Sequence, residues 1–283
     1  MTESSTRLFC LWAREASVGV VFRRGPTNLV QLLKWNLESD ELVPGQWFKG
    51  RIYERRCDLS PCGDYLIYFA ANHKAPYGIW SAISRPPYLT ALALWPKGDT
   101  WDGGGLFDAD GKGITLSHHS SKFELAKGFS LPANYRVRPY QAQSVMGEPI
   151  FVSRLQRDGW RRIRKGKQHK NPYNKTKIRI EYVEPEVWEK CALNANCSIH
   201  FELHGMMEIE GPFYVLKAMH IVEGEKVDLG RCDWADIKPD GTVYYSSGGE
   251  LIKRQMDGEQ RVIADLSDNE FYEMAPTPEA KKW

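Results

Sequence analysis

A basic segment between residues 154 and 179 holds the side chains best suited to chemistry. Six Arg and five Lys stand there against one acid, Asp158. Dense Lys and Arg bind polyanions because neutralising phosphates releases condensed counterions. Trp160, His169 and Tyr173 lie among these cations, and aromatic rings can stack on bases. The segment therefore supplies candidate residues for binding a nucleic acid or another polyanion: Arg161, Arg162, Arg164, Lys165, Lys167 and Lys170.

Two other interpretations of the basic segment remain open. Gly, Pro and Asn residues predict a loop over 165–176, so the charges could belong to a solvated insertion that keeps the protein in solution. Alternatively, the cations could face an acidic protein surface. The segment carries a net charge of +10 in a chain whose total is +2, which leaves 2 − 10 = −8 for the rest.

A second group is His200-Phe201-Glu202-Leu203-His204. Side chains alternate along a strand, so His200, Glu202 and His204 share one face. The two histidines lie about 13 Å apart at roughly 3.3 Å per residue, too far to bind one metal ion together. The pattern also differs from the helical His-Glu-x-x-His of metalloproteases. We therefore expect a polar strand face and assign no metal ligand.

Other motifs are incomplete. Asp108 begins a segment like a calcium loop, but Lys112 and His119 occupy positions that need oxygen ligands, which predicts an ordinary turn. The chain has no Gly-x-Ser-x-Gly elbow, and Ser117 and His118 come with no assigned acid. We therefore assign no catalytic residue. Four carboxylates near strand starts are expected to cap the ends of their sheets through hydrogen bonds: Asp58, Asp102, Asp233 and Asp236.

Composition is that of a soluble globular protein, with 42% hydrophobic and 26% charged residues in 283. The sequence shows neither a secretory leader nor a long apolar span, so we expect no membrane association. Six cysteines include no Cys-x-x-Cys pair, which favours reduced, mostly buried thiols in a cytoplasmic protein without a cofactor.

A turn signature repeated 178 residues apart indicates the architecture that must position these groups. It spans Asp58 to Gly63 and again Asp236 to Gly241. In each copy Pro suits the second position of a type I turn, and Gly suits the left-handed position before the returning strand. Two further sites, Asp110-Gly111 and Asp158-Gly159, keep only the Asp-Gly pair of this signature and predict weaker turns.

Candidate strands come in six groups of three or four, at about 47 residues each, close to the 40 to 45 of a propeller blade. The Leu-rich segment 29–37 also fits an amphipathic helix, but alternation favours a strand. The six groups begin near Arg7, Tyr53, Gly103, Pro149, Val187 and Asp233, the fourth with a strand over 149–154.

Asp58-Leu59-Ser60-Pro61-Cys62-Gly63-Asp64-Tyr65-Leu66-Ile67-Tyr68-Phe69 resembles the blade signature of TolB-like and WD-repeat propellers, and Trp234 to Gly241 resembles it as well. This resemblance implies a ring of four-stranded antiparallel sheets around a channel. We expect an all-β propeller of six blades, with five as the alternative. It would form one domain over 1–270, followed by a tail over 271–283 in which Pro276-Thr277-Pro278 suggests a loose end.

Propellers host many activities, so the fold does not determine function. We expect a non-catalytic scaffold that binds a macromolecular partner, a protein first of all, at its rim or channel. One alternative is a hydrolase of sugars or esters with carboxylates at the channel mouth. The other is a polyanion binder that works through residues 154–179. Whether the protein is an enzyme is left open, with a non-enzyme favoured.

Overall fold

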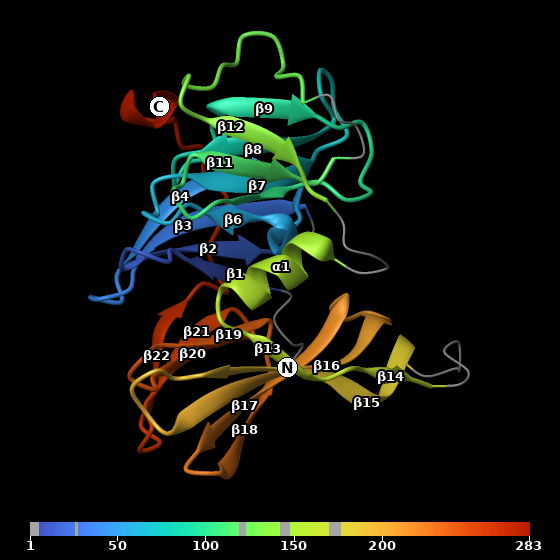
Figure 1. Ribbon diagram of the computed structural model, residues 1–283, viewed down its shortest axis with the longest axis vertical. Helices are drawn as coiled ribbons and strands as arrows, with labels where there is room; N and C mark the ends of the chain where they lie inside the picture. Colours follow the sequence, from blue (N-terminus) through green and yellow to red (C-terminus); the bar gives the residue numbers. More distant parts are fainter. Residues whose placement is uncertain (1–5, 26–27, 119–122, 142–147, 170–176) are drawn as a thin grey trace. The chain divides into compact units, whose positions relative to one another are not determined.

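The computed structural model describes residues 6–25, 28–118, 123–141, 148–169 and 177–283. Strands make up 49% of these residues and are arranged in five sheets (Figure 1). The all-β class is confirmed, and most of the neighbouring strands are antiparallel. Lys170 and His119 lie outside the described residues.

The chain divides into two compact units. Unit 1 comprises Met1–Leu8 and Leu155–Asp268, and unit 2 comprises Phe9–Arg154 and Asn269–Trp283. Among the described residues no helix is long and apolar enough to cross a membrane. The single domain over 1–270 and the number of blades stay predictions.

Unit 2 contains three of the sheets. The Leu-rich segment 29–37 forms a strand as expected, because alternating Trp35 and Leu33 pack inside. One four-stranded sheet consists of β1 (Arg7–Trp12), β2 (Val18–Arg24), β3 (Leu29–Asn36) and β4 (Leu42–Lys49). The next consists of β5 (Arg51–Ile52), β6 (Asp58–Leu59), β7 (Leu66–Ala71), β8 (Ile79–Ser84) and β9 (Ala93–Pro96).

The third sheet departs from the expected antiparallel blade. It contains β10 (Gly105–Phe107), β11 (Gly113–Leu116) and β12 (Arg136–Pro139). β11 is antiparallel to β10 but parallel to β12, so the chain must cross over between them. Ile67, Trp95, Phe107 and Ile114 form a buried cluster that joins this sheet to the one before it.

Residues 149–154, expected as a strand, begin the helix α1 (Pro149–Arg157). The strand prediction was wrong because the buried side chains follow a helical spacing: Ile150, Phe151, Arg154 and Leu155 are buried at i, i+1, i+4 and i+5. Asp158 and Gly159 do form the predicted turn, but it follows this helix instead of joining two strands. Gly159, with φ of 89°, ends this helix, and the Trp160 amide donates to Leu155 O at 2.9 Å.

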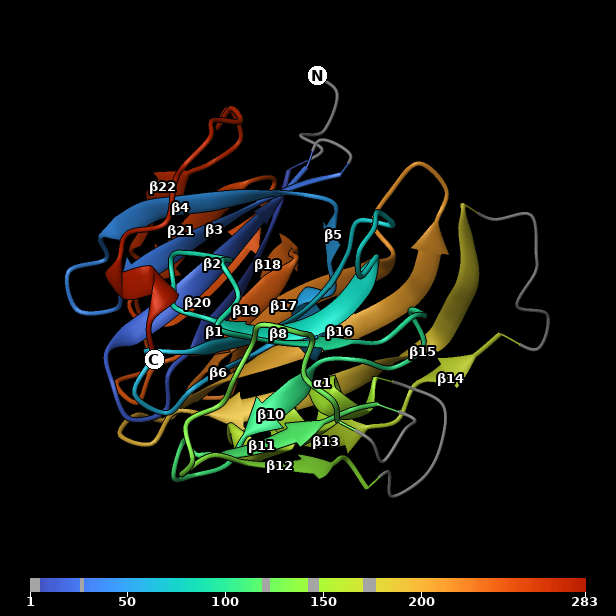
Figure 2. The same cartoon turned by 90° about the horizontal axis from the view of Figure 1, so that it is seen from above.

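Unit 1 contains the other two sheets. The larger consists of β13 (Arg161–Arg164), β14 (Lys167–Gln168), β15 (Ile178–Cys191), β16 (Cys197–Glu208), β17 (Tyr214–Val222) and β18 (Glu225–Arg231). The smaller consists of β19 (Trp234–Ile237), β20 (Val243–Ser247), β21 (Glu250–Arg254) and β22 (Gln260–Asp265). The long strands β15 and β16 extend together beyond the rest of the larger sheet (Figures 1 and 2).

The repeated turns are confirmed. The Gly63 amide donates to Ser60 O at 2.9 Å, and the Gly241 amide donates to Lys238 O at 3.0 Å. Both glycines are left-handed, with φ of 79° and 89°. Gly111 closes a third such turn between β10 and β11. Each turn joins two antiparallel strands, as the signature predicts.

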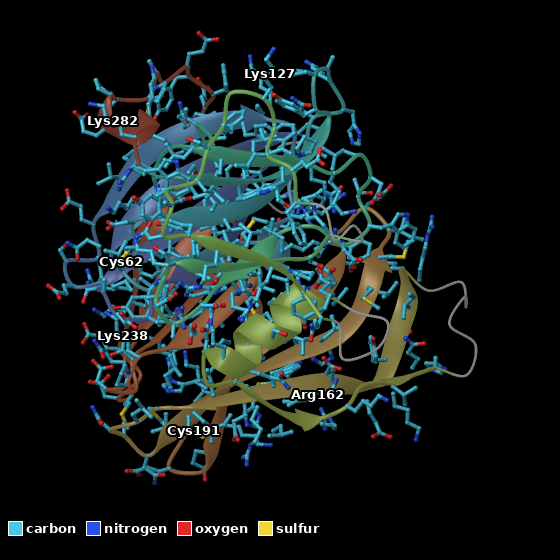
Figure 3. The ribbon with its side chains drawn as sticks, turned by 45° about the horizontal axis from the view of Figure 1, so that its top comes forward. Cys62, Lys127, Arg162, Cys191, Lys238 and Lys282 are labelled. Atoms are coloured by element: carbon cyan, nitrogen blue, oxygen red, sulfur yellow. The ribbon has the colours of Figure 1, made fainter. Side chains whose placement is uncertain are left out.

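The C-terminal segment is packed against unit 2, so the loose end expected from its prolines is wrong. Phe271 and Tyr272 contact Trp47 edge to face, with ring centroids 6.1 and 6.5 Å apart. Trp283 lies against Tyr65 at 5.4 Å and donates through its indole to Ser130 O at 2.9 Å. Aromatic side chains hold the segment in place, and Lys282 marks its end in Figure 3.

Candidate functional site

The basic candidates lie on the strands at one edge of the larger sheet of unit 1. Arg161, Arg162 and Arg164 belong to β13, and Lys167 belongs to β14. Both strands pair with β15, and all four side chains are exposed. Lys165, also exposed, connects the two strands, so part of the loop expected over 165–176 is a strand instead (Figure 3 labels Arg162).

Glutamates of β15 neutralise this row of cations. Arg161 pairs with Glu189 at 2.8 Å. Arg162 lies 3.6 Å from Glu186, and Lys167 lies 3.2 Å from Glu184. The Arg164 guanidinium donates to the Pro185 carbonyl at 2.9 Å. The strand therefore presents alternating ion pairs in place of a uniformly positive surface.

Glu189 joins the two motifs that the sequence analysis treated separately. Its Oε2 accepts from Arg161, and its Oε1 lies 3.2 Å from Nε2 of His200 on β16. The register explains this meeting, because Glu189 pairs with Arg161 on one side and with His200 on the other. The hydrogen bond from Arg161 lowers the pKa of Glu189, so the carboxylate is ionised at neutral pH.

The two histidines of β16 serve different carboxylates. His204 Nε2 lies 2.9 Å from Glu202 Oε2, whereas His200 faces Glu189. A bulge between Leu203 and Gly205 interrupts the pairing of β16 with β17 beside His204. Within the described ranges no cluster of three His, Cys, Asp or Glu side chains could hold a metal ion. Independently of this, the two histidines and Glu202 are half-buried whereas Phe201 is buried, which is the alternation of a polar strand face.

Large apolar side chains are also exposed in unit 1. Val183 is 56% exposed, Ile209 56% and Phe213 43%. They belong to what we call the arm: β14, residues 178–184 of β15, residues 205–208 of β16, and the turn over 209–213 that leads into β17. The ring of Phe213 also contacts Tyr214 with centroids 4.8 Å apart. Exposed apolar groups beside ordered charges are typical of interaction surfaces.

The sequence analysis missed the glutamates of β15 and the apolar side chains of the arm. The sequence did contain a signal for the glutamates. Glu184, Glu186 and Glu189 lie on either side of Val187 and Trp188, two apolar residues that are buried in the strand. They were overlooked because the charge count ended at residue 179. Strand pairing, which brings distant charges together, cannot be read from a local charge count.

Two of the four carboxylates near strand starts make the structural contacts that were expected. The buried Asp58 accepts from the Phe107 amide at 2.8 Å, joining two sheets of unit 2. Asp236 accepts from Lys190 Nζ at 2.7 Å, joining the two sheets of unit 1. Burial raises the pKa of Asp236, and the Lys190 ammonium opposes that rise.

The loop that begins at Asp108 is an ordinary turn. Asp110 accepts from the amides of Lys112 and Gly113 at 2.8 and 2.9 Å and pairs with Arg136. The two amides and Arg136 hold the pKa of Asp110 well below its usual range.

A serine and histidine pair lies in unit 2. Ser81 Oγ is 2.9 Å from His118 Nε2 and accepts from the Gly104 amide at 2.9 Å. The distance suits proton transfer from a nucleophilic serine, but Ser81 is 0% exposed. A substrate could not reach this hydroxyl, so the pair serves as a hydrogen-bonded link between β8 and the segment that follows β11.

Comparison with known proteins finds structures similar to this chain but no family to which it can be assigned. No protein family model matches the chain, and no curated protein matches it. Among solved structures, uncharacterized protein lmo1340 from Listeria monocytogenes EGD-e has a TM-score of 0.33 and 10% identity over 96% of this chain and 88% of that one. The β-propeller domain of the Trilobed protease from Pyrococcus furiosus has a TM-score of 0.30 and 10% identity over 97% and 100%. Oligogalacturonate lyase in complex with manganese has a TM-score of 0.26 and 12% identity over 91% and 78%.

Proposed function

We propose that this protein is a non-catalytic scaffold that binds a macromolecular partner, and that the partner is a protein held by the arm. The observation that carries the proposal is the exposure of Val183, Ile209 and Phe213 on the arm, which also holds the Lys167–Glu184 ion pair. Apolar anchors within a polar rim are the usual composition of a protein interface. The TolB-like or WD-repeat resemblance and a closed ring of blades belong to the same proposal.

The ion pairs favour a protein partner over a uniform polyanion. A protein surface can offer both signs of charge, and the arm does so through Lys167 with Glu184. Arg162 with Glu186 does the same on the neighbouring part of β13 and β15. A row of phosphates would have to displace these glutamates or lie against them, which costs binding free energy.

Comparative affinity capture from the native cell tests the proposal. The wild-type chain, a Phe213→Glu variant and a Leu193→Ser control would serve as baits. Leu193 is 83% exposed in the turn between β15 and β16 and lies outside the arm, so it controls for the loss of an exposed apolar side chain. We expect a protein captured by the wild type and the control and reduced at least about tenfold with Phe213→Glu. Equal capture of every protein by all three baits would refute the assignment to the arm.

Polyanion binding is the second candidate, favoured by the exposure of β13 and of Lys165 and Lys167. Binding of a short oligonucleotide, measured over a series of salt concentrations, tests it. Affinity that falls as salt rises, and that weakens in a Lys165→Glu, Lys167→Glu variant, would support this candidate. Affinity independent of salt would exclude it. The hydrolase alternative gains no support from Asp58 and Asp236, whose carboxylates hold sheets together.

A further inference from the structure

Residues Asn269–Trp283 form what we call the strap. The strap belongs to unit 2, although the residues that lead into it, up to Asp268, belong to unit 1. It forms no strand, and none of its backbone N–H groups donates to the rest of the described chain. Side chains and two carbonyl groups of the strap hold it in place instead. Such contacts depend only on which residues meet, so the strap of another copy of this chain can make them equally well.

The beginning of the strap is docked on the sheet of β1 to β4. The Phe271 ring contacts Trp47 with centroids 6.1 Å apart, and Lys49 Nζ lies 4.0 Å from the centroid of the same ring. Asn269 donates through its side chain to Gln31 Oε1 at 2.8 Å. Gln31 is only 1% exposed and neighbours Trp47 across β3 and β4. The buried amide of Gln31 therefore receives a hydrogen bond from the strap.

The end of the strap is docked by rings and cations of unit 2. Trp283 contacts Tyr65 and Tyr135 with centroids 5.4 and 5.1 Å apart, and the two tyrosine rings lie 6.4 Å from each other. Arg85 donates through Nη2 to the Tyr65 hydroxyl at 2.7 Å and through Nε to the carbonyl of Lys282 at 2.8 Å (Figure 3 labels Lys282). Unit 2 thus binds an aromatic side chain at each end of the strap.

The connection that leads into the strap is short. Ser267 is fixed within unit 1, because its Oγ donates to Gly248 O at 3.2 Å and its carbonyl accepts from Thr6 Oγ1 at 3.3 Å. Asn269 already bonds to unit 2, so the exposed Asp268 is the one residue between these two attachments. Short connections favour the exchange of a segment between copies, because they leave the segment little freedom to close on its own chain.

We propose that unit 2 carries a docking surface for the strap of a second copy of this chain, and that two copies assemble by exchanging residues 269–283. In the exchanged dimer, Phe271 and Trp283 of each copy lie against the same rings in unit 2 of the other, and the contacts of the strap are all retained. The arrangement is symmetric, because each copy gives one strap and accepts one. The arm belongs to unit 1, so the failure of either proposal leaves the other intact.

A crosslink that can form only between copies tests the exchange. Lys112 Nζ lies 4.7 Å from the centroid of the Tyr135 ring, which contacts Trp283 next to Lys282. An amine crosslinker can therefore join Lys112 to Lys282 when a strap is docked. One full-length copy would carry Lys112→Arg and the other Lys282→Arg, co-expressed under different tags. In this pair a Lys112–Lys282 crosslink has to join two copies, whereas in the wild type it forms in either arrangement.

We expect this crosslink in a species that has the mass of two chains and is retained by both tags. Trp283→Ser in the copy that supplies Lys282 should reduce it at least about tenfold. Trp101→Ser in the same copy is the control, because Trp101 is 78% exposed and forms none of the contacts of the strap.

A crosslink that forms in the wild type but is absent from the pair would overturn the proposal, since the strap would then stay on its own chain. Copies that never co-purify through both tags would overturn it as well. If the Trp283 variant does not fold, the pair without that change still decides.

Discussion

Glu189 neutralises part of the basic segment and links it to His200 on β16. It accepts from Arg161 and faces His200, so two sets of residues that suggest different chemistry become one polar row on a sheet. Together with Glu186 it cancels charge that would otherwise attract polyanions. At the residue scale, we therefore expect these glutamates to weaken any attraction of the basic segment for nucleic acid.

Replacement of Glu186 and Glu189 by neutral residues should increase the affinity of the basic segment for nucleic acid. In a Glu186→Gln, Glu189→Gln variant, Arg161 and Arg162 lose their ion-pair partners. We expect tighter binding of a short oligonucleotide and a salt dependence steeper by about one unit per freed cation. Fluorescence anisotropy over a salt series measures both. Glu225→Gln, an exposed change on β18, is the control, and identical salt slopes for all proteins would contradict the account.

His220 should make stability depend on pH. Burial, with a smaller contribution from Arg254, lowers its pKa from 6.5 to about 4. The unfolded chain therefore takes up this proton first as the pH falls, so the free energy of unfolding decreases between pH 6.5 and 4. The decrease approaches about 3 kcal/mol.

The measurement is urea unfolding at several pH values for the wild type and for His220→Phe. Taking the difference between the two proteins cancels the titration of other groups. The wild type should lose stability relative to the variant as the solution becomes more acidic. If the difference in unfolding free energy between the two proteins stays constant from pH 7 to 4, the pKa of His220 is not lowered by folding.

At the scale of elements, the sequence predicted correctly those turns and strands whose cause lies in the backbone preferences of neighbouring residues. Pro61 and Gly63 prescribe a turn through their own dihedral preferences, and so do Pro239 and Gly241. The face shared by His200 and Glu202 followed from strand alternation. The helix α1 was missed because Arg154, a charged residue, occupies its buried face and hides the apolar period. The ion pairs of β13 with β15 depend on pairing across the chain, which no local pattern contains.

The turn glycines should differ in their tolerance of alanine. A Cβ at Gly63 would lie 2.8 Å from Val18, whereas a Cβ at Gly98 would meet nothing within 4 Å. Both residues have positive φ and both belong to unit 2, so backbone strain of about 1 to 2 kcal/mol is common to them. Gly63→Ala should therefore cost more unfolding free energy than Gly98→Ala. Equal losses in urea unfolding would show that the turn is not packed against β2.

At the scale of the whole molecule, the C-terminal segment belongs to unit 2 and contacts its sheets from 271 to 283. Gln46 donates to Met274 O at 3.0 Å, and Arg85 donates to Lys282 O at 2.8 Å. Deletion of residues 271–283 should lower the thermal unfolding midpoint by several degrees, because it uncovers Trp47 and Tyr65.

A Lys281→Ala variant controls for this deletion, since its side chain is exposed at the same end of the chain. It should unfold like the wild type. An unchanged midpoint after the deletion would mean that the segment adds nothing to the stability of unit 2.

The proposed function depends on the binding of a protein partner to the arm. Amide hydrogen exchange of this chain, measured alone and with the partner recovered by the wild-type bait, reports that binding. We expect slower exchange over residues 178–184 and 205–213, with no change over β7 and β8 of unit 2. Protection confined to unit 2, with the arm exchanging as it does in the free protein, would contradict it.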